Sequence, residues 1–369
     1  MKAEDTLSRK DVVLRRLAAN GLAERFPDAV SCAGSLFGIQ GQVQSYANLS
    51  LFSRVERLTM GKLSEAYSKR MLVNQWGQRK TLHIYDPKDS PAVCDLFNSS
   101  NYMDKLAKPD VREAVKVIIS EEIQKNGSIT RGRVKRLLND RIPQSALKMD
   151  YRDYAVISWL SNNGVLLGEA GGPSVKDLFL PDYQWTKSEE QRERSLEDVL
   201  LRYFTCYGPA TRQDFCHYSG LTLKETNRAF DSIKDRLNID TYKGKPIYSA
   251  GPQKTAPARM LTVLGHYDPL LVAYADKDWL CGPEYKAKVW QTSGIVAGAI
   301  LSGHRMLGIW KPQLNPETVS FIIEPFSDIS EYEQRRIEKR MSQISKFLKK
   351  KMTEITYGEI PGPRIGPEE

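Results

Sequence analysis

The sequence predicts an α+β protein in which three helical modules, each closed by a small β-hairpin, precede a short β-rich domain. Three observations support this prediction: a clear pattern of helices and a hairpin over 190–250, the same order of elements upstream, and a change of texture after about residue 255. The 369 residues are enough for two to three domains of about 100–200 residues each. The fold class is therefore a chain of small modules rather than one large sheet.

The segment 190–250 carries the clearest pattern. Ser195 with Asp198, and Thr222 with Glu225, have the spacing of capping boxes, and apolar residues follow each pair at helical intervals. The Gly208-Pro209 pair ends the first predicted helix. A tight turn then separates two short extended runs near the end of the segment, which predicts a hairpin. Three helices and a hairpin are the order of a winged helix, although another small α+β domain could share it.

The same order recurs twice upstream. Over 105–185, two helices and a third from Tyr151 to Asn162 precede extended runs at 164–166 and 178–180. Over 1–104, helices are expected at 7–19, 27–38, 44–57 and 61–70, followed by extended stretches at 71–75 and 81–85. The segments share no sequence repeat. The prediction of three tandem winged helices, at 1–104, 105–185 and 190–250, therefore depends on element order alone.

The C-terminal part has a different sequence pattern, with short β-rich runs in place of helical spacing. Six β-rich runs occur over 255–325, which predicts a small β-barrel or sandwich, and we expect the barrel. A charged amphipathic helix is expected over 327–352, followed by a tail at 353–369 whose last part, PGPRIGPEE at 361–369, is expected to be disordered.

Composition and charge limit the class of protein. Lys and Arg number 54 against 45 Asp and Glu, a net charge of +9, which favours a polyanionic partner without proving one. The five scattered cysteines lack metal-ligand spacing and are expected to be reduced and mostly buried. The N-terminus has no apolar signal-peptide core, and no run approaches the roughly 18 apolar residues of a membrane span. We expect a cytoplasmic monomer.

Residue types alone give weak indications of a site. Gln40 and Gln42 point apart on a helix but share a face on an extended stretch, and Gly38 and Gly41 permit such a bend. Without further information, a solvated polar helix end is the more common explanation. The GEAGGPS run at 168–174 lacks the Lys-Ser/Thr of a phosphate loop.

Basic residues suggest a second surface. On a recognition helix they would contact phosphates, but a solvated basic face explains them equally well. They lie in the second module at Arg131, Arg133, Lys135 and Arg136. Arg79, Lys80 and His83 lie around the first hairpin, where a lone histidine is more often structural than catalytic.

Five segments together resemble the AlkZ family of winged-helix DNA glycosylases, also called the YcaQ family. The first is GIQGQ followed by LSLFSRV, with Arg54 fourteen positions after Gln40, which is similar to the family's LGxQAQ…LxLWxR. The second, LVNQWGQRKTLHIY at 72–85, resembles LVRxWxMRGTLHL. The others are LLRYFTCYGPATRQDFCHYSGL at 200–221, GHYDPLLVAYADK at 265–277 and VAGAILSGHRMLGIWK at 296–311. They run in the family's order from about residue 7 to 325.

The resemblance implies three tandem winged helices and a C-terminal β-barrel around duplex DNA. It implies monofunctional excision of bulky N7-alkylpurines, and in some members of interstrand crosslinks. The family's essential glutamine motif falls on Gln40 and Gln42, and we expect Arg54 to join Arg79, Lys80 and His83 in contacting DNA. The partner would be double-stranded DNA with alkylated bases, and neither a metal nor a cofactor is expected.

The chain also departs from the family's pattern. Gly41 replaces an aliphatic residue, and Gln42-Val43-Gln44 forms a second QxQ one register later. Lys80 stands where the family has Gly, and Gly265-His266 replaces its Pro-x. Two other functions remain open from sequence alone: a non-catalytic winged-helix DNA-binding protein, such as a transcription regulator or DNA-damage resistance factor, and a protein–protein scaffold.

Overall fold

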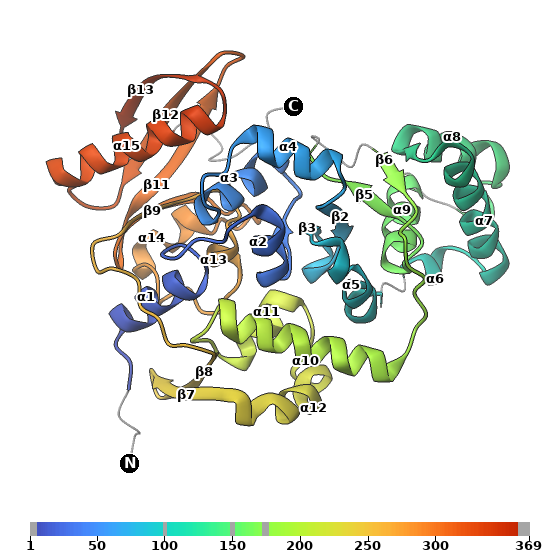
Figure 1. Cartoon of the computed structure of the whole chain (residues 1–369), viewed down its shortest axis with the longest axis horizontal. Coiled ribbons are helices and arrows are strands. Elements are labelled where there is room, and N and C mark those ends of the chain that lie inside the picture. Colours follow the sequence, from blue (N-terminus) through green and yellow to red (C-terminus); the bar gives the residue numbers. More distant parts are fainter. Residues whose placement is uncertain (1–5, 99–101, 148–151, 172–176, 361–369) are drawn as a thin grey trace.

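A computed structural model describes residues 6–98, 102–147, 152–171 and 177–360. In Figure 1 the N-terminal helices occupy the centre, the α7–α9 segment lies to the right, α10–α12 and their hairpin lie below, and the C-terminal sheet with α15 lies at the upper left. The segments therefore gather around the N-terminal part of the chain.

The N-terminal segment alternates short helices with the strands of a sheet. Ser8 caps the first helix in a capping box with Asp11, and Thr59 caps the fourth, which explains where both begin. The elements are α1 Arg9–Ala19, α2 Ala29–Ser35, β1 Ile39–Gln40, α3 Gln44–Arg54, α4 Met60–Ser68, β2 Val73–Trp76, η1 Gln78–Lys80, β3 Leu82–Tyr85, η2 Pro87–Asp89 and α5 Ser90–Phe97.

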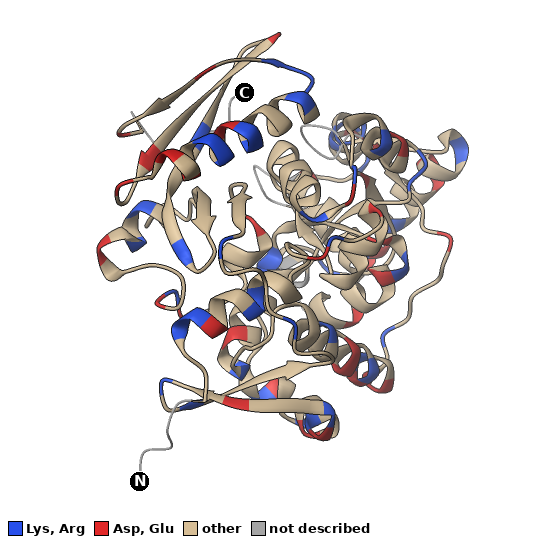
Figure 2. Cartoon of the chain, turned by 60° about the vertical axis from the view of Figure 1, so that its left-hand side comes forward, with Lys and Arg blue, Asp and Glu red and all other residues tan. Residues whose placement is uncertain are grey.

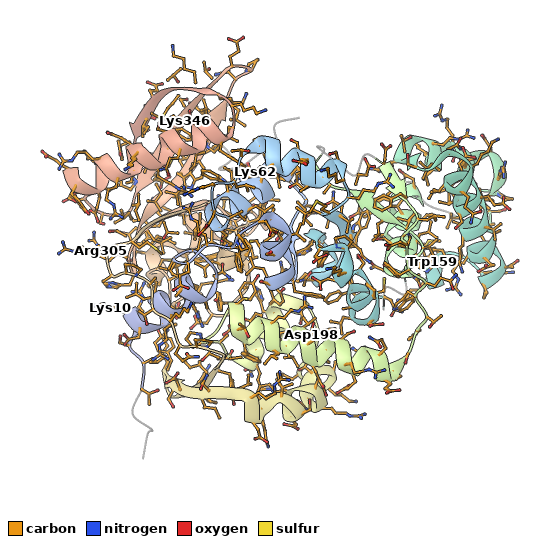
Figure 3. All side chains as sticks on the ribbon, viewed as in Figure 1. Lys10, Lys62, Trp159, Asp198, Arg305 and Lys346 are labelled. Carbon is orange, nitrogen blue, oxygen red and sulfur yellow. The ribbon has the colours of Figure 1, made fainter. Side chains whose placement is uncertain are left out.

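The middle segment joins the first through a shared sheet of six strands, in the order β1-β3-β2-β5-β6-β4. Its elements are α6 Tyr102–Leu106, α7 Pro109–Asn126, β4 Ile129–Thr130, α8 Arg131–Arg141, α9 Arg152–Asn162, β5 Leu167–Glu169 and β6 Asp177–Phe179. Strand β2 pairs antiparallel with β5, so the two predicted wings form one structure. Trp159 of α9, labelled in Figure 3, packs against a core that belongs mainly to this segment. Tyr151, the expected start of α9, lies outside the described residues.

Three helices and a hairpin follow over 189–250, in the predicted order. They are α10 Glu189–Cys206, α11 Arg212–Ser219, α12 Leu223–Ile233, η3 Lys234–Arg236, β7 Leu237–Tyr242 and β8 Lys245–Ala250. The capping boxes at Thr211 and Thr222 are present. The predicted start at Ser195 is wrong, because Ser188 caps α10 and Ser195 lies inside the helix, where its hydroxyl donates to the Asp95 carboxylate at 2.6 Å.

The C-terminal part corrects three predictions. The expected barrel is, in the described part of the chain, an open sheet of five strands in the order β13-β12-β11-β10-β9. One expected β run, at 269–275, contains helix α13, and another, at 287–293, overlaps the end of helix α14. The helices begin at Pro269 and Pro283, since proline favours the first position of a helix. The elements are β9 Leu261–Leu264, α13 Pro269–Val272, α14 Pro283–Val289, β10 Gly298–Ser302, β11 Arg305–Leu314, β12 Thr318–Pro325, α15 Glu331–Phe347 and β13 Lys351–Tyr357.

The third correction concerns the expected end of the last helix and the tail. Helix α15 ends at Phe347, and β13 then pairs in parallel with β12 within the stretch expected to be the end of the helix and the tail. Strand β13 is largely exposed, so its sequence lacks the apolar alternation that marks a half-buried strand. The rest of the expected tail, 361–369, lies outside the described residues.

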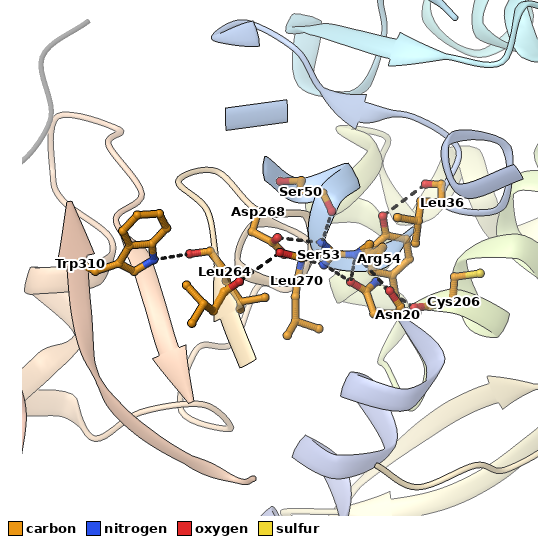
Figure 4. Close-up of polar contacts among 12 residues, drawn as sticks. Asn20, Leu36, Ser50, Ser53, Arg54, Cys206, Leu264, Asp268, Leu270 and Trp310 are labelled. Atoms are coloured by element: carbon orange, nitrogen blue, oxygen red, sulfur yellow. Dashed lines mark hydrogen bonds and ion pairs between the residues drawn. The ribbon is translucent and has the colours of Figure 1, made fainter. Parts of the chain in front are cut away.

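One hydrophobic core joins the N-terminal segment, the 189–250 segment and the C-terminal sheet. At its centre lies Arg54, the last residue of α3, with a fully buried side chain (Figure 4). Its guanidinium donates to both carboxylate oxygens of Asp268, at 2.8 and 2.6 Å. It also donates to the backbone and side-chain oxygens of Asn20, and the Asn20 amide donates to the carbonyl of Cys206 at 3.0 Å.

This arrangement makes Arg54 a connector of four segments: the end of α1, α3, the end of α10 and the loop before α13. A buried guanidinium of this kind is stable only while its donors are matched by acceptors, because desolvation of an unpaired charge is very costly.

Replacing Arg54 with leucine should therefore destabilise the protein by about 3–5 kcal/mol, because Asp268 would be left buried without its partner. Urea unfolding at neutral pH measures the change. Arg57→Leu, at an exposed position three residues on, is the matched control and should change stability by less than about 0.5 kcal/mol. A decrease below about 1 kcal/mol in Arg54→Leu would contradict this role for the ion pair.

Candidate active site

The two glutamines of the motif lie outside any helix. Gln40 ends the short strand β1 and is partly buried, and Gln42 is exposed on the bend that leads into α3. Strand β1 pairs with β3, so that Gln40 is opposite His83, and the amide of Gly41 donates to the carbonyl of Leu82 at 2.8 Å. Gln40 therefore has an extended backbone, and the chain bends at Gln42 before α3 begins.

Glycines shape the approach to this strand. Gly38 has φ +93°, which side chains rarely adopt, and a Cβ there would lie 2.5 Å from the Tyr85 ring. The backbone conformation and the contact with Tyr85 both exclude a side chain at this position. Gly41 has no positive φ, yet a Cβ would meet the Ile84 side chain at 2.9 Å and Asn74 Oδ1 at 3.3 Å. The glycine between the glutamines thus fits a tightly packed strand, whereas the sequence suggested a flexible one.

A set of side chains holds the turn just before the motif. The Gln78 amide, fully buried, donates to the carbonyl of Phe37 at 2.5 Å and to the Tyr218 hydroxyl at 2.9 Å. The Tyr218 hydroxyl donates in turn to the carbonyl of Leu36 at 2.9 Å, and Tyr207 donates to the same carbonyl at 3.2 Å. Tyr85 donates its hydroxyl to the Gln78 amide oxygen. These contacts fix the backbone from which Gln40 and Gln42 project.

Arg79 touches the motif directly. Its guanidinium donates to the Gln40 amide oxygen at 3.4 Å and to the carbonyl of Tyr218 at 2.6 Å, and burial lowers its pKa. Because an arginine can only donate, the oxygen of the Gln40 amide is the atom turned toward it. The expectation that Arg79 contacts DNA is therefore incomplete: in this structure it orients a glutamine of the motif.

Lys80 is exposed at the next position of the same turn. Its φ is +61°, in the left-handed region that glycine adopts without strain. This conformation accounts for the glycine that the resembled family has here. Lys80 stays a candidate DNA contact.

The prediction that His83 contacts DNA is wrong. Its side chain is buried, and Nδ1 lies 3.0 Å from the carbonyl oxygen of Thr81. Burial, and then the positive charge of Arg79, lower the pKa of His83 to about 3, so the ring is neutral at physiological pH. A buried neutral ring cannot serve as a cationic phosphate contact.

Arg54 is the second expected DNA contact that the structure rules out, because its buried guanidinium is engaged by Asp268 and Asn20. The resembled family keeps this arginine at the same distance in sequence from the glutamine motif. The structure explains the spacing, because α3 begins just after the motif and ends at Arg54.

Gln44, the end of the alternative QxQ register, is buried and fully engaged. Its amide nitrogen donates to Asn48 and Tyr67, each at 2.8 Å, and its oxygen accepts the backbone amide of Gly171 at 3.0 Å. No hydrogen bond is found for the Gln42 side chain within the described part of the chain. The geometry therefore favours Gln40 and Gln42 as the pair available to a substrate.

The basic residues of α8 divide into two groups. Arg131 pairs with Asp153 at 2.6 Å and Arg133 with Glu122 at 2.8 Å. Lys135 and Arg136 are exposed, and among the residues described neither has an ion pair. The second group is the better candidate for phosphate contacts.

Three further observations describe the chemistry that the chain can support. All five cysteines are free and four are buried, as expected, and burial raises the pKa of the Cys32 thiol to about 12. The described ranges hold no group of three or more His, Cys, Asp or Glu side chains suited to a metal ion. None of the helices they contain is long and apolar enough to cross a bilayer.

Sequence reasoning missed the residues that support the motif. Gln78, Tyr207 and Tyr218 lie within the segments that resemble the AlkZ family, but only the fold brings them to one turn. One signal was available for Gln78, which stands where the family has Met. A polar side chain where relatives have an apolar one can indicate a buried hydrogen-bond partner.

Comparisons with known proteins identify the family of the chain. The family model described as DNA glycosylase AlkZ-like matches residues 33–347. The "Interstrand DNA cross-link repair glycosylase" of Streptomyces sahachiroi is 24% identical over 347 residues, covering 87% of this chain and 91% of that protein. The solved structure of Streptomyces sahachiroi DNA glycosylase AlkZ matches with a TM-score of 0.77 at 21% identity, covering 97% of this chain and all of that one. Because the family model spans most of its length, the chain belongs to the AlkZ-like DNA glycosylases.

Proposed function

We propose that this DNA glycosylase hydrolyses the N-glycosidic bond of N7-alkylated purines in duplex DNA, and that Gln40 and Gln42 orient the attacking water. The observation that carries the proposal is the placement of two amides, two residues apart and outside any helix, one oriented by Arg79 and the other exposed. The name of the Streptomyces sahachiroi relative extends the proposed substrates to interstrand crosslinks.

The chemistry of the substrate explains why amides suffice. Alkylation at purine N7 leaves the base positively charged, so it departs as a neutral leaving group without protonation by the enzyme. The site must then place a water near the anomeric carbon and accommodate an oxocarbenium-like transition state. Amides are poor bases, but they can orient that water by hydrogen bonds.

The two glutamines would have different tasks. With its oxygen turned toward Arg79, Gln40 offers its amide N–H groups to the water or the sugar. Gln42, with no partner found in the described chain, can offer its oxygen as the acceptor for a water proton. Together they would provide one donor and one acceptor on the same face.

Alanine at either Gln40 or Gln42 should slow single-turnover excision of 7-methylguanine from duplex DNA by about 10²-fold or more, because the variant cannot form a hydrogen bond that stabilises the transition state. Duplex affinity and the urea midpoint should stay close to those of the unaltered protein. Gln124→Ala, on the exposed face of α7, is the matched control and should keep full activity.

Gln44→Ala separates the two possible registers of the motif. It should lower stability, because three hydrogen bonds are removed, while the folded fraction keeps its excision rate. A folded Gln44→Ala protein that is inactive, with Gln40→Ala fully active, would move the motif to Gln42-Val43-Gln44. Full activity of the Gln40→Ala, Gln42→Ala double variant would exclude the catalytic role.

We also propose that Lys135 and Arg136 of α8 contact phosphates. Charge reversal at both should weaken duplex binding alike for different sequences, and each phosphate that is no longer neutralised should reduce the salt slope of log K by about 0.9. Fluorescence anisotropy between low and moderate salt measures this. Arg228→Glu, on exposed α12, is the control. Unchanged affinity at low salt would show that this face of α8 is only solvated.

A further inference from the structure

A cavity of about 420 Å³ lies under α15, and its lining includes none of the candidate active-site residues. Four cations line it: Arg25 from the loop between α1 and α2, and Arg336, Lys339 and Arg340 from one face of α15. Figure 2 shows the basic residues distributed along α15, with acidic residues toward its first turns. Among the described residues, no Asp or Glu lines the cavity.

Arg340 is the most enclosed of these cations. Its guanidinium lies over the Phe52 ring, 4.6 Å from the centroid, and donates to Gln343 Oε1 at 3.0 Å and to the Ser53 hydroxyl at 3.4 Å. Both partners are neutral. Burial, and then the charge of Arg25, lower the pKa of Arg340 to about 10. Two guanidinium groups thus lie close enough to repel each other, with no anion between them.

The other cations also lack a neutralising partner. Within the described ranges, none of the four cations forms an ion pair. Glu56, which is exposed, is the acidic group whose charge acts on Arg25. Arg336 donates to the carbonyl of Arg259. Arg336 and Arg340 are partly buried, whereas Arg25 and Lys339 are exposed. Clustered cations without a partner raise the energy of the empty site, most at the partly buried positions, and an anion would lower it.

Polar side chains add donors to the same cavity. The Thr262 hydroxyl, on β9, is buried and has no hydrogen-bond partner in the described structure. A buried hydroxyl without a partner is uncommon and indicates a missing ligand or water. Ser53 lines the cavity beside it. Guanidinium groups, an ammonium group and hydroxyls are the donors that proteins use around phosphate oxygens.

We propose that this cavity binds a phosphate group, held by Arg25, Lys339 and Arg340 with the Thr262 hydroxyl as an additional donor. The phosphate can belong to the backbone of bound DNA or to a free phosphate or nucleotide, since the donors are the same. In the first case the cavity is a DNA contact far along the chain from α8. Phosphate binding in this cavity does not require the glutamine motif to be catalytic, because the cavity contains none of its residues.

The free-phosphate arm compares thermal unfolding of the whole protein in inorganic phosphate, chloride and acetate at equal ionic strength. Phosphate at about ten times its Kd should raise Tm by about 2 °C over chloride. Arg340→Gln and Lys339→Gln should abolish the difference. Their matched controls are Arg335→Gln and Lys346→Gln, on α15 but outside the cavity, which should keep it; Lys346 is labelled in Figure 3.

The DNA arm measures binding of an undamaged duplex as salt is varied. If the phosphate is that of DNA, Lys339→Gln should reduce the salt slope of log K by about 0.9 while Lys346→Gln reduces it less. Lys339 is exposed, so its variant tests the site even if Arg340→Gln fails to fold. A change in either arm, confined to the cavity variants, supports the site and identifies the source. No change in both arms, or equal stabilisation by acetate, would overturn the proposal.

Discussion

A single buried arginine sets the frame on which the candidate active site depends. Arg54 carries a full charge into the protein interior, and it is tolerated there because Asp268, Asn20 and the backbone supply acceptors for its donors. These acceptors come from segments more than 200 positions apart in the sequence. The N-terminal helices, the end of α10 and the C-terminal sheet must therefore assemble together, which agrees with their single shared core.

The motif takes its shape from the same assembly. The end of α10 provides Tyr207 and α11 provides Tyr218, and both hydroxyls reach the carbonyl of Leu36 just before β1. The Gln78 amide, from the turn between β2 and β3, donates to the carbonyl of Phe37, the next residue along the chain. Short, packed contacts of this kind leave a two-residue strand little freedom. Two neutral amides can act on a water only if they are held in place beforehand, because they cannot compensate for poor placement by strong basicity.

The sequence predicted most helices and the hairpin at 237–250, because apolar spacing, capping residues and glycines act locally. For the glutamine motif, residue types alone favoured a polar helix end, whereas the structure places both glutamines outside any helix. It could not predict which strands pair across segments, so the six-stranded sheet and the parallel strand β13 were missed. Charge was the weakest guide. Arg54 and His83 look like DNA contacts in the sequence, whereas burial decides their roles, and burial depends on segments distant along the chain. Conversely, the cations under α15 looked like an ordinary solvated helix face until the fold placed Arg25 beside them.

We propose that a site built from amides acts only on bases that are already charged. Single-turnover excision by the unaltered protein can be compared for two duplexes that differ in one base, 7-methylguanine or the uncharged hypoxanthine. We expect release of 7-methylguanine and no release of hypoxanthine above the uncatalysed background. Excision of both bases at comparable rates would contradict this proposal, because departure of an uncharged purine needs an acid that Gln40 and Gln42 cannot supply.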